Sequence, residues 1–159
     1  MRLARAARAT PPESAAVGSS ARGAVMLVTL EAGFDPEAER LAVSSALDGG
    51  LPLRLVDLID MSTSPFSMLT GHRSMATAEE RDAVRQTAAT AAALGLEVAI
   101  LNVRSRRPAR ALVEVAAEER PSLIVVGPSR VRDRRRLRSV VEQACTLSCL
   151  VWIAEGLPV

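Results

Sequence analysis

The chain has 159 residues, of which 48% are hydrophobic and 2% aromatic, and its formal net charge is +2. This length suffices for one domain with a substantial core, and the scarcity of aromatic rings argues against binding of single-stranded nucleic acid, whose bases stack on such rings. The chain has 20 arginines and no lysine, which excludes lysine-dependent Schiff-base and P-loop chemistry. No apolar run approaches the ~20 residues of a membrane span, and the start of the chain lacks the apolar stretch of a secretory signal, so we expect a cytoplasmic protein.

Positive charge is concentrated in one short segment. Residues 1–22 carry a net charge of +3, and residues 23–159 carry a net charge of −1. Within the second range, residues 130–138 hold six arginines and one aspartate. We call residues 130–138 the arginine block; it stands out as a cationic segment in an otherwise acidic domain.

The first half of the chain predicts a strand, a helix and a second strand after a disordered tail. Residues 1–23 lack hydrophobic periodicity and predict the tail, and the domain is expected over residues 24–156. Residues 25–30 form a continuous apolar run, which is typical of a strand covered on both faces. Asp35 and Pro36 predict the N-cap and first residue of a helix that ends near residue 50. A second apolar run at residues 51–59 predicts the next strand.

Further along the chain, strands and helices continue to alternate. A loop over residues 61–76 precedes Thr77 and Glu80, which have the spacing of a capping box and predict a helix ending before Gly95. Residues 96–103 predict the third strand. Pro108 predicts the start of a helix that Pro121 ends, with a buried stripe of apolar residues at helical spacing: Ala109, Leu112, Val113 and Ala116. Residues 123–126 predict the fourth strand.

The C-terminal part predicts one more helix and a fifth strand. Asp133 is the predicted N-cap, and the buried stripe of this helix is Leu137, Val140, Val141 and Ala144. Residues 150–154 form the last apolar run. Five strands alternating with four helices predict an α/β domain with a parallel, doubly wound sheet. Ligands of such sheets bind beyond the carboxyl ends of the strands, where the strand order reverses.

Three segments in this order resemble the universal stress protein family: LIVVGPS at residues 123–129, SVVE at residues 139–142, and CLVWI at residues 149–153. The resemblance covers about residues 24–156. It implies a five-stranded parallel sheet of order 3-2-1-4-5 with helices on both faces, the Rossmann-like fold of the adenine-nucleotide alpha-hydrolases. The carboxyl ends of the first and fourth strands would then flank the ligand crevice.

ATP-binding members of this family carry an aspartate after the first strand, and after the fourth strand a motif of glycine, two residues, glycine, nine residues, glycine and a serine or threonine. Glu31 stands near the aspartate position, Gly127 matches the first glycine, and Ser139 matches the final hydroxyl residue. Arg130 and Arg138 stand where the second and third glycines belong, and the spacer between them is two residues shorter. The resemblance therefore implies a divergent member with a degenerate nucleotide motif.

Glycines in a phosphate loop allow backbone N–H groups to approach the anion closely, whereas arginine can attract phosphate only through its side chain. We therefore expect no ordinary ATP binding and no required cofactor. Two alternatives stay open: Arg130 and Arg138 bind ATP or another phosphate anion, or the arginine block recruits an acidic protein partner. A plainer interpretation is that the block is a solvated helix face paired with nearby carboxylates, and that Glu31 is a solvated turn residue.

Nothing in the sequence supports catalysis or metal binding. Ser129 follows the fourth strand directly, but its surroundings do not form the G-x-S-x-G turn of serine hydrolases, and no cluster of residues has metal-ligand spacing. The resemblance implies a non-enzymatic regulatory or accessory protein. It also implies a homodimer through the apolar edge strand that contains Leu150, Val151, Trp152 and Ile153.

Overall fold

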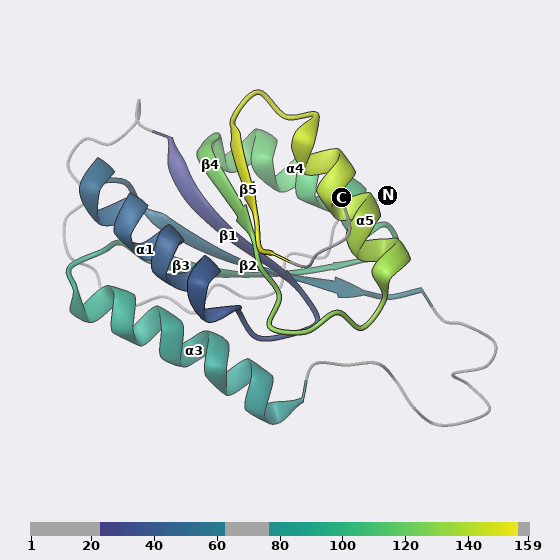
Figure 1. Ribbon diagram of the computed structural model, residues 1–159, viewed down its shortest axis with the longest axis horizontal. Helices are drawn as coiled ribbons and strands as arrows, with labels where there is room; N and C mark the ends of the chain where they lie inside the picture. The colour runs from purple at the N-terminus through teal and green to yellow at the C-terminus, as the bar shows by residue number, and fades with distance from the viewer. Residues whose placement is uncertain (1–22, 63–76, 156–159) are drawn as a thin grey trace.

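The computed structural model describes residues 23–62 and 77–155 and contains a five-stranded parallel sheet between two layers of helices (Figure 1). The strands are β1 (Ala24–Leu30), β2 (Leu53–Asp60), β3 (Val98–Ser105), β4 (Pro121–Val126) and β5 (Leu150–Ile153). The helices are α1 (Pro36–Gly49), α3 (Ala78–Ala93), α4 (Pro108–Glu119) and α5 (Arg134–Cys145). The strand order is β3-β2-β1-β4-β5, which confirms the predicted α/β fold and its topology.

Apart from Gly23, the predicted tail over residues 1–23 lies outside the described residues, as do residues 63–76 of the predicted loop. None of the helices in the two described ranges is long and apolar enough to cross a membrane.

The helix starts follow the predicted capping residues. The carboxylate of Asp35 accepts hydrogen bonds from the N–H groups of Glu37 and Ala38 at 3.0 and 3.1 Å. The capping box of Thr77 and Glu80 forms in both directions. Caps of this kind satisfy N–H groups that have no partner within the helix, which is why the local sequence marks these boundaries well.

The fourth strand begins two residues earlier than predicted. The preceding helix ends before Pro121, as expected, but Pro121 is already the first residue of β4, whereas the strand was expected to begin at residue 123. The helix ends at Glu119 because Arg120 adopts a left-handed conformation, with φ at 48°. Proline lacks the N–H that a helix needs, but it is tolerated at the first position of a strand.

Helices α1 and α3 cover one face of the sheet, and α4 and α5 cover the other (Figure 1). The predicted stripe of α5 is buried at all four positions. The predicted stripe of α4 is partly wrong, since Ala109 and Val113 are only half-buried and Ala111 is buried instead. Helix α4 packs against α5 as well as against β2 and β3, and this second contact widens the buried face beyond a single stripe.

Candidate functional site

The strand order reverses between β1 and β4, so a ligand crevice is expected where the loops after these two strands separate. In this chain, backbone hydrogen bonds connect the two loops to each other. The N–H of Asp35 donates to the carbonyl oxygen of Gly127 at 2.9 Å, and the N–H of Ser129 donates to that of Gly33 at 2.8 Å. Backbone groups that could face a ligand at this point are therefore bonded to each other.

Gly127 is explained by packing. A Cβ atom at this position would lie 2.2 Å from the Cβ of Ala38 in α1, which is far closer than two such carbons can approach. Gly127 does not have a positive φ, so its backbone does not need the left-handed region that favours glycine. The missing side chain of Gly127 allows α1 to pack closely against the end of β4, and this packing explains the glycine without a bound ligand.

Glu31 is buried, and the interpretation of it as a solvated turn residue is wrong. Its exposed fraction is 6%, and its backbone is left-handed, with φ at 49°. Its Oε1 accepts a hydrogen bond from the N–H of Asp60 at 3.1 Å, so the side chain joins the ends of β1 and β2. Burial raises the pKa of Glu31 above its ordinary value, although the hydrogen bond from Asp60 opposes this shift.

A second buried carboxyl group lies on β2 beside the end of β1. Asp57 pairs in register with Thr29, has an exposed fraction of 4%, and its Oδ1 has no hydrogen-bond partner among the described residues. Burial raises the pKa of Asp57 to about 7, and the negative charge of Glu31 acts in the same direction. Asp57 was not among the predicted site residues. Its signal in the sequence is a single carboxylate in the middle of an apolar strand.

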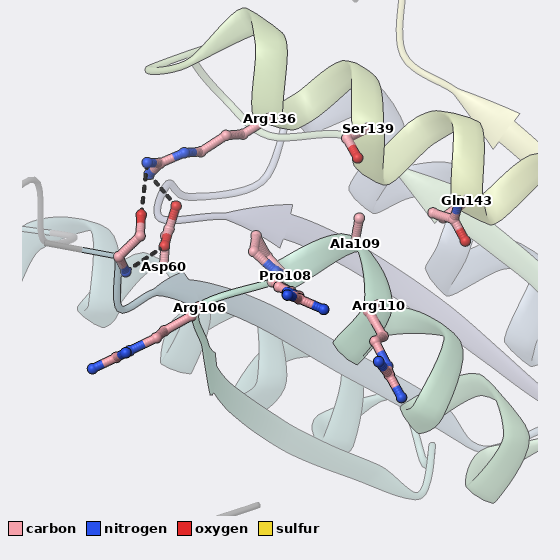
Figure 2. Close-up of a pocket in the computed structure, with 10 residues that line it drawn as sticks. Asp60, Arg106, Pro108, Ala109, Arg110, Arg136, Ser139 and Gln143 are labelled. Carbon is pink, nitrogen blue, oxygen red and sulfur yellow. Dashed lines mark hydrogen bonds and ion pairs between the residues drawn. The ribbon is translucent and has the colours of Figure 1, made fainter. Parts of the chain in front are cut away.

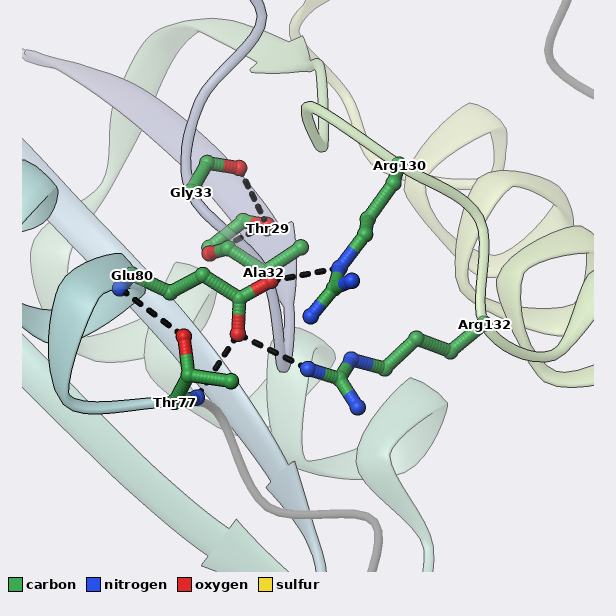
Figure 3. A network of polar contacts seen from close by, with 7 residues as sticks. All are labelled: Thr29, Ala32, Gly33, Thr77, Glu80, Arg130 and Arg132. Carbon is green, nitrogen blue, oxygen red and sulfur yellow. Dashed lines mark hydrogen bonds and ion pairs between the residues drawn. The ribbon is translucent and has the colours of Figure 1, made fainter.

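Two arginines of the block are bound to the start of α3. Figure 3 shows Arg130 and Arg132 reaching from the loop after β4 to the carboxylate of Glu80, which both of them contact. The Nη2 of Arg132 lies 2.8 Å from Oε2 of Glu80, and the same oxygen accepts the N–H of Thr77 at 2.7 Å. Burial raises the pKa of Glu80, but the bond from Thr77 and the two arginines outweigh it, so the pKa is lowered overall.

A third arginine is bound at the start of α5. Arg136 forms ion pairs with Asp60 at the end of β2 and with Asp133, the N-cap of its own helix. The carboxylate of Asp133 accepts the N–H of Arg136 at 3.1 Å. The start of α5 therefore already holds a negative group where a helix could otherwise bind an anion.

The two remaining predicted site residues are not at the start of a helix. Arg138 and Ser139 lie beyond the first turn of α5 and are exposed. Backbone N–H groups at such positions bond to carbonyl oxygens one turn earlier and are not available to a phosphate. The structure thus brings Glu31, Gly127 and Ser129 to the switch point, while Arg138 and Ser139 lie further along α5.

The model of the universal stress protein family matches residues 25–146, which is more than half of the chain. The chain belongs to the universal stress protein family. A search of curated proteins found no matching sequence. Similar solved structures do exist, and all three described next have low sequence identity.

A universal stress protein from Archaeoglobus fulgidus in complex with dAMP is 16% identical, with a TM-score of 0.55 over 83% of this chain and 97% of that one. A family member from Burkholderia pseudomallei is 22% identical, with a TM-score of 0.50 over 82% and 96%. A universal stress protein in complex with cAMP is 22% identical, with a TM-score of 0.51 over 84% and 98%. These likenesses confirm the fold.

Within this universal stress protein, Glu80 is the residue that sequence analysis recognised only as part of a cap. Its ion pairs with Arg130 and Arg132 link α3 to the loop after β4. One feature of the sequence pointed to this contact: the acidic first turn of α3 and the arginine block both follow strands of the same parallel sheet. The carboxyl ends of these strands lie at one edge of the sheet, but the packing of α3 decides which acidic side chain faces which arginine.

Replacing Glu80 is expected to destabilise the protein in two separable steps. Glu80→Gln keeps an acceptor for the N–H of Thr77 but removes the charge, and a loss of about 1 kcal/mol is expected. Glu80→Ala also removes the cap and should lose about 2 kcal/mol. Because the pKa of Glu80 is lowered from 4.5, the charge stabilises the fold fully above that pH and less as the pH falls below it.

Urea denaturation of the wild type and both variants at neutral and acidic pH would measure these differences. The neighbouring Glu79 is exposed, and Glu79→Gln is the matched control, with an expected change within about 0.5 kcal/mol. Equal stability of Glu80→Gln and the wild type at neutral pH would show that the two ion pairs do not contribute.

Proposed function

We propose that this protein is a regulatory or accessory member of the universal stress protein family that has no catalytic activity and does not bind ATP in the way that motif-bearing members do. The proposal rests on the family, on the two motif positions occupied by Arg130 and Arg138, and on the contacts around the switch point.

The observation that carries the proposal is the ion-pair bridge from Glu80 to Arg130 and Arg132. A phosphate group arriving after β4 would have to compete with a carboxylate that is already paired and mostly buried, with an exposed side-chain fraction of 12%. Because the two guanidinium groups share this carboxylate, one of their two positive charges is neutralised and part of their hydrogen-bonding capacity is used, so they attract a further anion less strongly. Asp133 occupies the start of α5 in a comparable way.

The nucleotides in the solved relatives do not weaken this proposal. The proteins in complex with dAMP and with cAMP are 16% and 22% identical to this chain. Sequence identity at this level supports a shared fold, but it does not support a shared binding site. What supports loss of ordinary binding here is local: arginine side chains stand where a phosphate loop needs residues without a Cβ atom.

The second element of the proposal is a homodimer formed through β5. This strand lies at the edge of the sheet and pairs only with β4 among the described strands. Leu150 has an exposed fraction of 74%, and Val151, Trp152 and Ile153 are half-buried. An apolar edge strand with free N–H and carbonyl groups favours pairing with a second copy.

Native mass spectrometry of the purified protein tests both elements together, because it reports the assembly mass and any retained nucleotide. We expect a dimer without nucleotide. Calorimetry with ATP should give no binding tighter than about 100 μM. ATP binding below that value that is abolished by Arg130→Ala and Arg138→Ala would refute the first element, and a monomer at micromolar concentration would refute the second.

A second candidate function is recruitment of an acidic protein. Arg134, Arg135 and Arg138 are exposed on α5 and form no ion pair with other described residues. This face of α5 carries positive charge that the domain does not neutralise. Binding of a partner there should weaken as salt shortens the screening length to ~8 Å near physiological ionic strength.

A further inference from the structure

A cleft of about 540 Å³ lies between the start of α4 and the face of α5 that is turned toward it. Four of the residues that line it are arginines, namely Arg106, Arg107, Arg110 and Arg136. In Figure 2, Ser139 and Gln143 project from α5 toward the start of α4, and Arg106 and Arg110 extend on either side of that start. The cleft is thus formed by two helices and lies on the α4 and α5 face of the sheet.

The charge of the cleft is not balanced by the acids around it. Asp60 is the one carboxylate in its lining, and Arg136 already pairs with that group. Arg110 contacts Glu114 in its own helix at 3.3 Å, at an exposed position where such pairs are weak. Arg106 and Arg107 form no ion pair with any described residue, and both are exposed. At least two guanidinium groups are therefore available to a ligand.

The start of α4 adds to this positive field. It has no side-chain cap and no acidic residue in its first turn, in contrast to α1 and α3. Pro108 begins the helix, and the N–H groups of the next residues have no partner within the helix. These N–H groups and the helix dipole favour an anion at the same end of the cleft that the arginines line.

We propose that this cleft binds a small phosphate-bearing anion through Arg106, Arg107 and Arg110, with Ser139 and Gln143 as hydrogen-bonding groups on the opposite wall. Arginine matches phosphate oxygens with two parallel hydrogen bonds, and several arginines together suit a ligand with more than one negative charge, such as a pyrophosphate group. The apolar part of the lining is limited to Pro108 and Ala109, so none of the described lining residues offers an aromatic ring on which a nucleobase could stack.

This inference goes beyond the proposed function and does not depend on it. The arginines that carry it follow β3 and do not belong to the nucleotide motif, although Ser139 on the opposite wall is the final hydroxyl residue of that motif. Arg130 and Arg132, in contrast, contact Glu80 of α3, which covers the other face of the sheet. Binding in the cleft and binding at the motif can therefore be separated by variants of different arginines.

Calorimetry with pyrophosphate tests the inference on the full chain. Pyrophosphate should bind with a Kd below about 1 mM, and the double variant Arg106→Gln/Arg110→Gln should weaken binding at least about tenfold. Both side chains are exposed, so the fold should be retained. Arg136→Gln is not suitable, because it would leave Asp60 buried without its counter-charge.

The matched control is Arg134→Gln/Arg135→Gln, which removes the same charge from exposed positions of α5 that do not line the cleft. Its Kd should stay within about twofold of the wild type. ADP should bind like pyrophosphate, and adenosine should not bind. The inference is overturned if pyrophosphate does not bind, or if both double variants weaken binding equally. It is also overturned if Arg130→Gln abolishes binding and Arg106→Gln/Arg110→Gln does not, a result that would instead contradict the proposed function.

Discussion

Replacing Asp57 by asparagine is expected to stabilise the protein by about 2 kcal/mol near pH 8 and to destabilise it by about 2 kcal/mol near pH 4, where the wild-type carboxyl group is protonated in the fold. Asp57 is buried on β2, and its folded-state pKa is raised from 3.8 to about 7. Keeping the group ionised in the fold therefore costs on the order of 4 kcal/mol. The asparagine removes this cost but leaves part of its amide without a partner, which offsets about 2 kcal/mol of the gain.

The sign of this pH dependence follows from proton binding. Between pH 3.8 and about 7 the folded protein holds a proton on Asp57 that the unfolded chain has released. Stability of the wild type therefore falls as the pH rises through this window and is constant above it with respect to this group. The charged groups that face Asp57 are Glu31 at the end of β1, and Glu80 and Arg81 in α3. The negative charges of Glu31 and Glu80 raise the pKa of Asp57, whereas the charge of Arg81 and a hydrogen bond from the backbone N–H of Glu31 lower it.

Thermal unfolding from about pH 4 to pH 8 would measure the effect. A gain of about 2 kcal/mol corresponds to a rise in Tm of roughly 4–8 °C for a domain of this size. Asp48 is an exposed carboxylate near the end of α1, and Asp48→Asn is the control that should leave the pH profile unchanged. The prediction fails if Asp57→Asn follows the wild-type profile with the same slope across the window.

Replacing Gly127 by alanine should destabilise the fold by about 3 kcal/mol, and removing the methyl group of Ala38 should restore much of that loss. The new Cβ would lie 2.2 Å from the Cβ of Ala38, so α1 would have to move away from the end of β4. In the double variant Ala38→Gly/Gly127→Ala, position 38 loses the methyl group that position 127 gains, so the two Cβ atoms no longer clash. The remaining cost is that of glycine in α1, about 1 kcal/mol.

Urea denaturation of both single variants and the double variant forms the required cycle. We expect a coupling free energy of about 3 kcal/mol, with the double variant more stable than Gly127→Ala alone. Additive losses would mean that the contact with Ala38 does not explain the glycine. The outcome bears on function as well, because a glycine explained by packing is no evidence for a surviving phosphate loop.

The sequence determined the fold. Apolar runs, helical stripes, and the caps at Asp35, Thr77 and Asp133 are local signals, and they located each strand and helix of the described chain to within about two residues. The motif comparison likewise identified Arg130 and Arg138 as departures from a nucleotide loop, since this requires only residue types and spacing. The arrangement of elements was accessible because parallel sheets with helical crossovers allow few topologies.

Only the tertiary structure decided how the charges are used. Glu80 and Arg132 are 52 residues apart, and their contact depends on where α3 crosses the carboxyl edge of the sheet. The same holds for the burial of Glu31 and Asp57, and for the cleft that places Arg106 and Arg110 opposite α5. The sequence lists these charges, but their pairing, burial and pKa depend on distances between elements that no local pattern encodes.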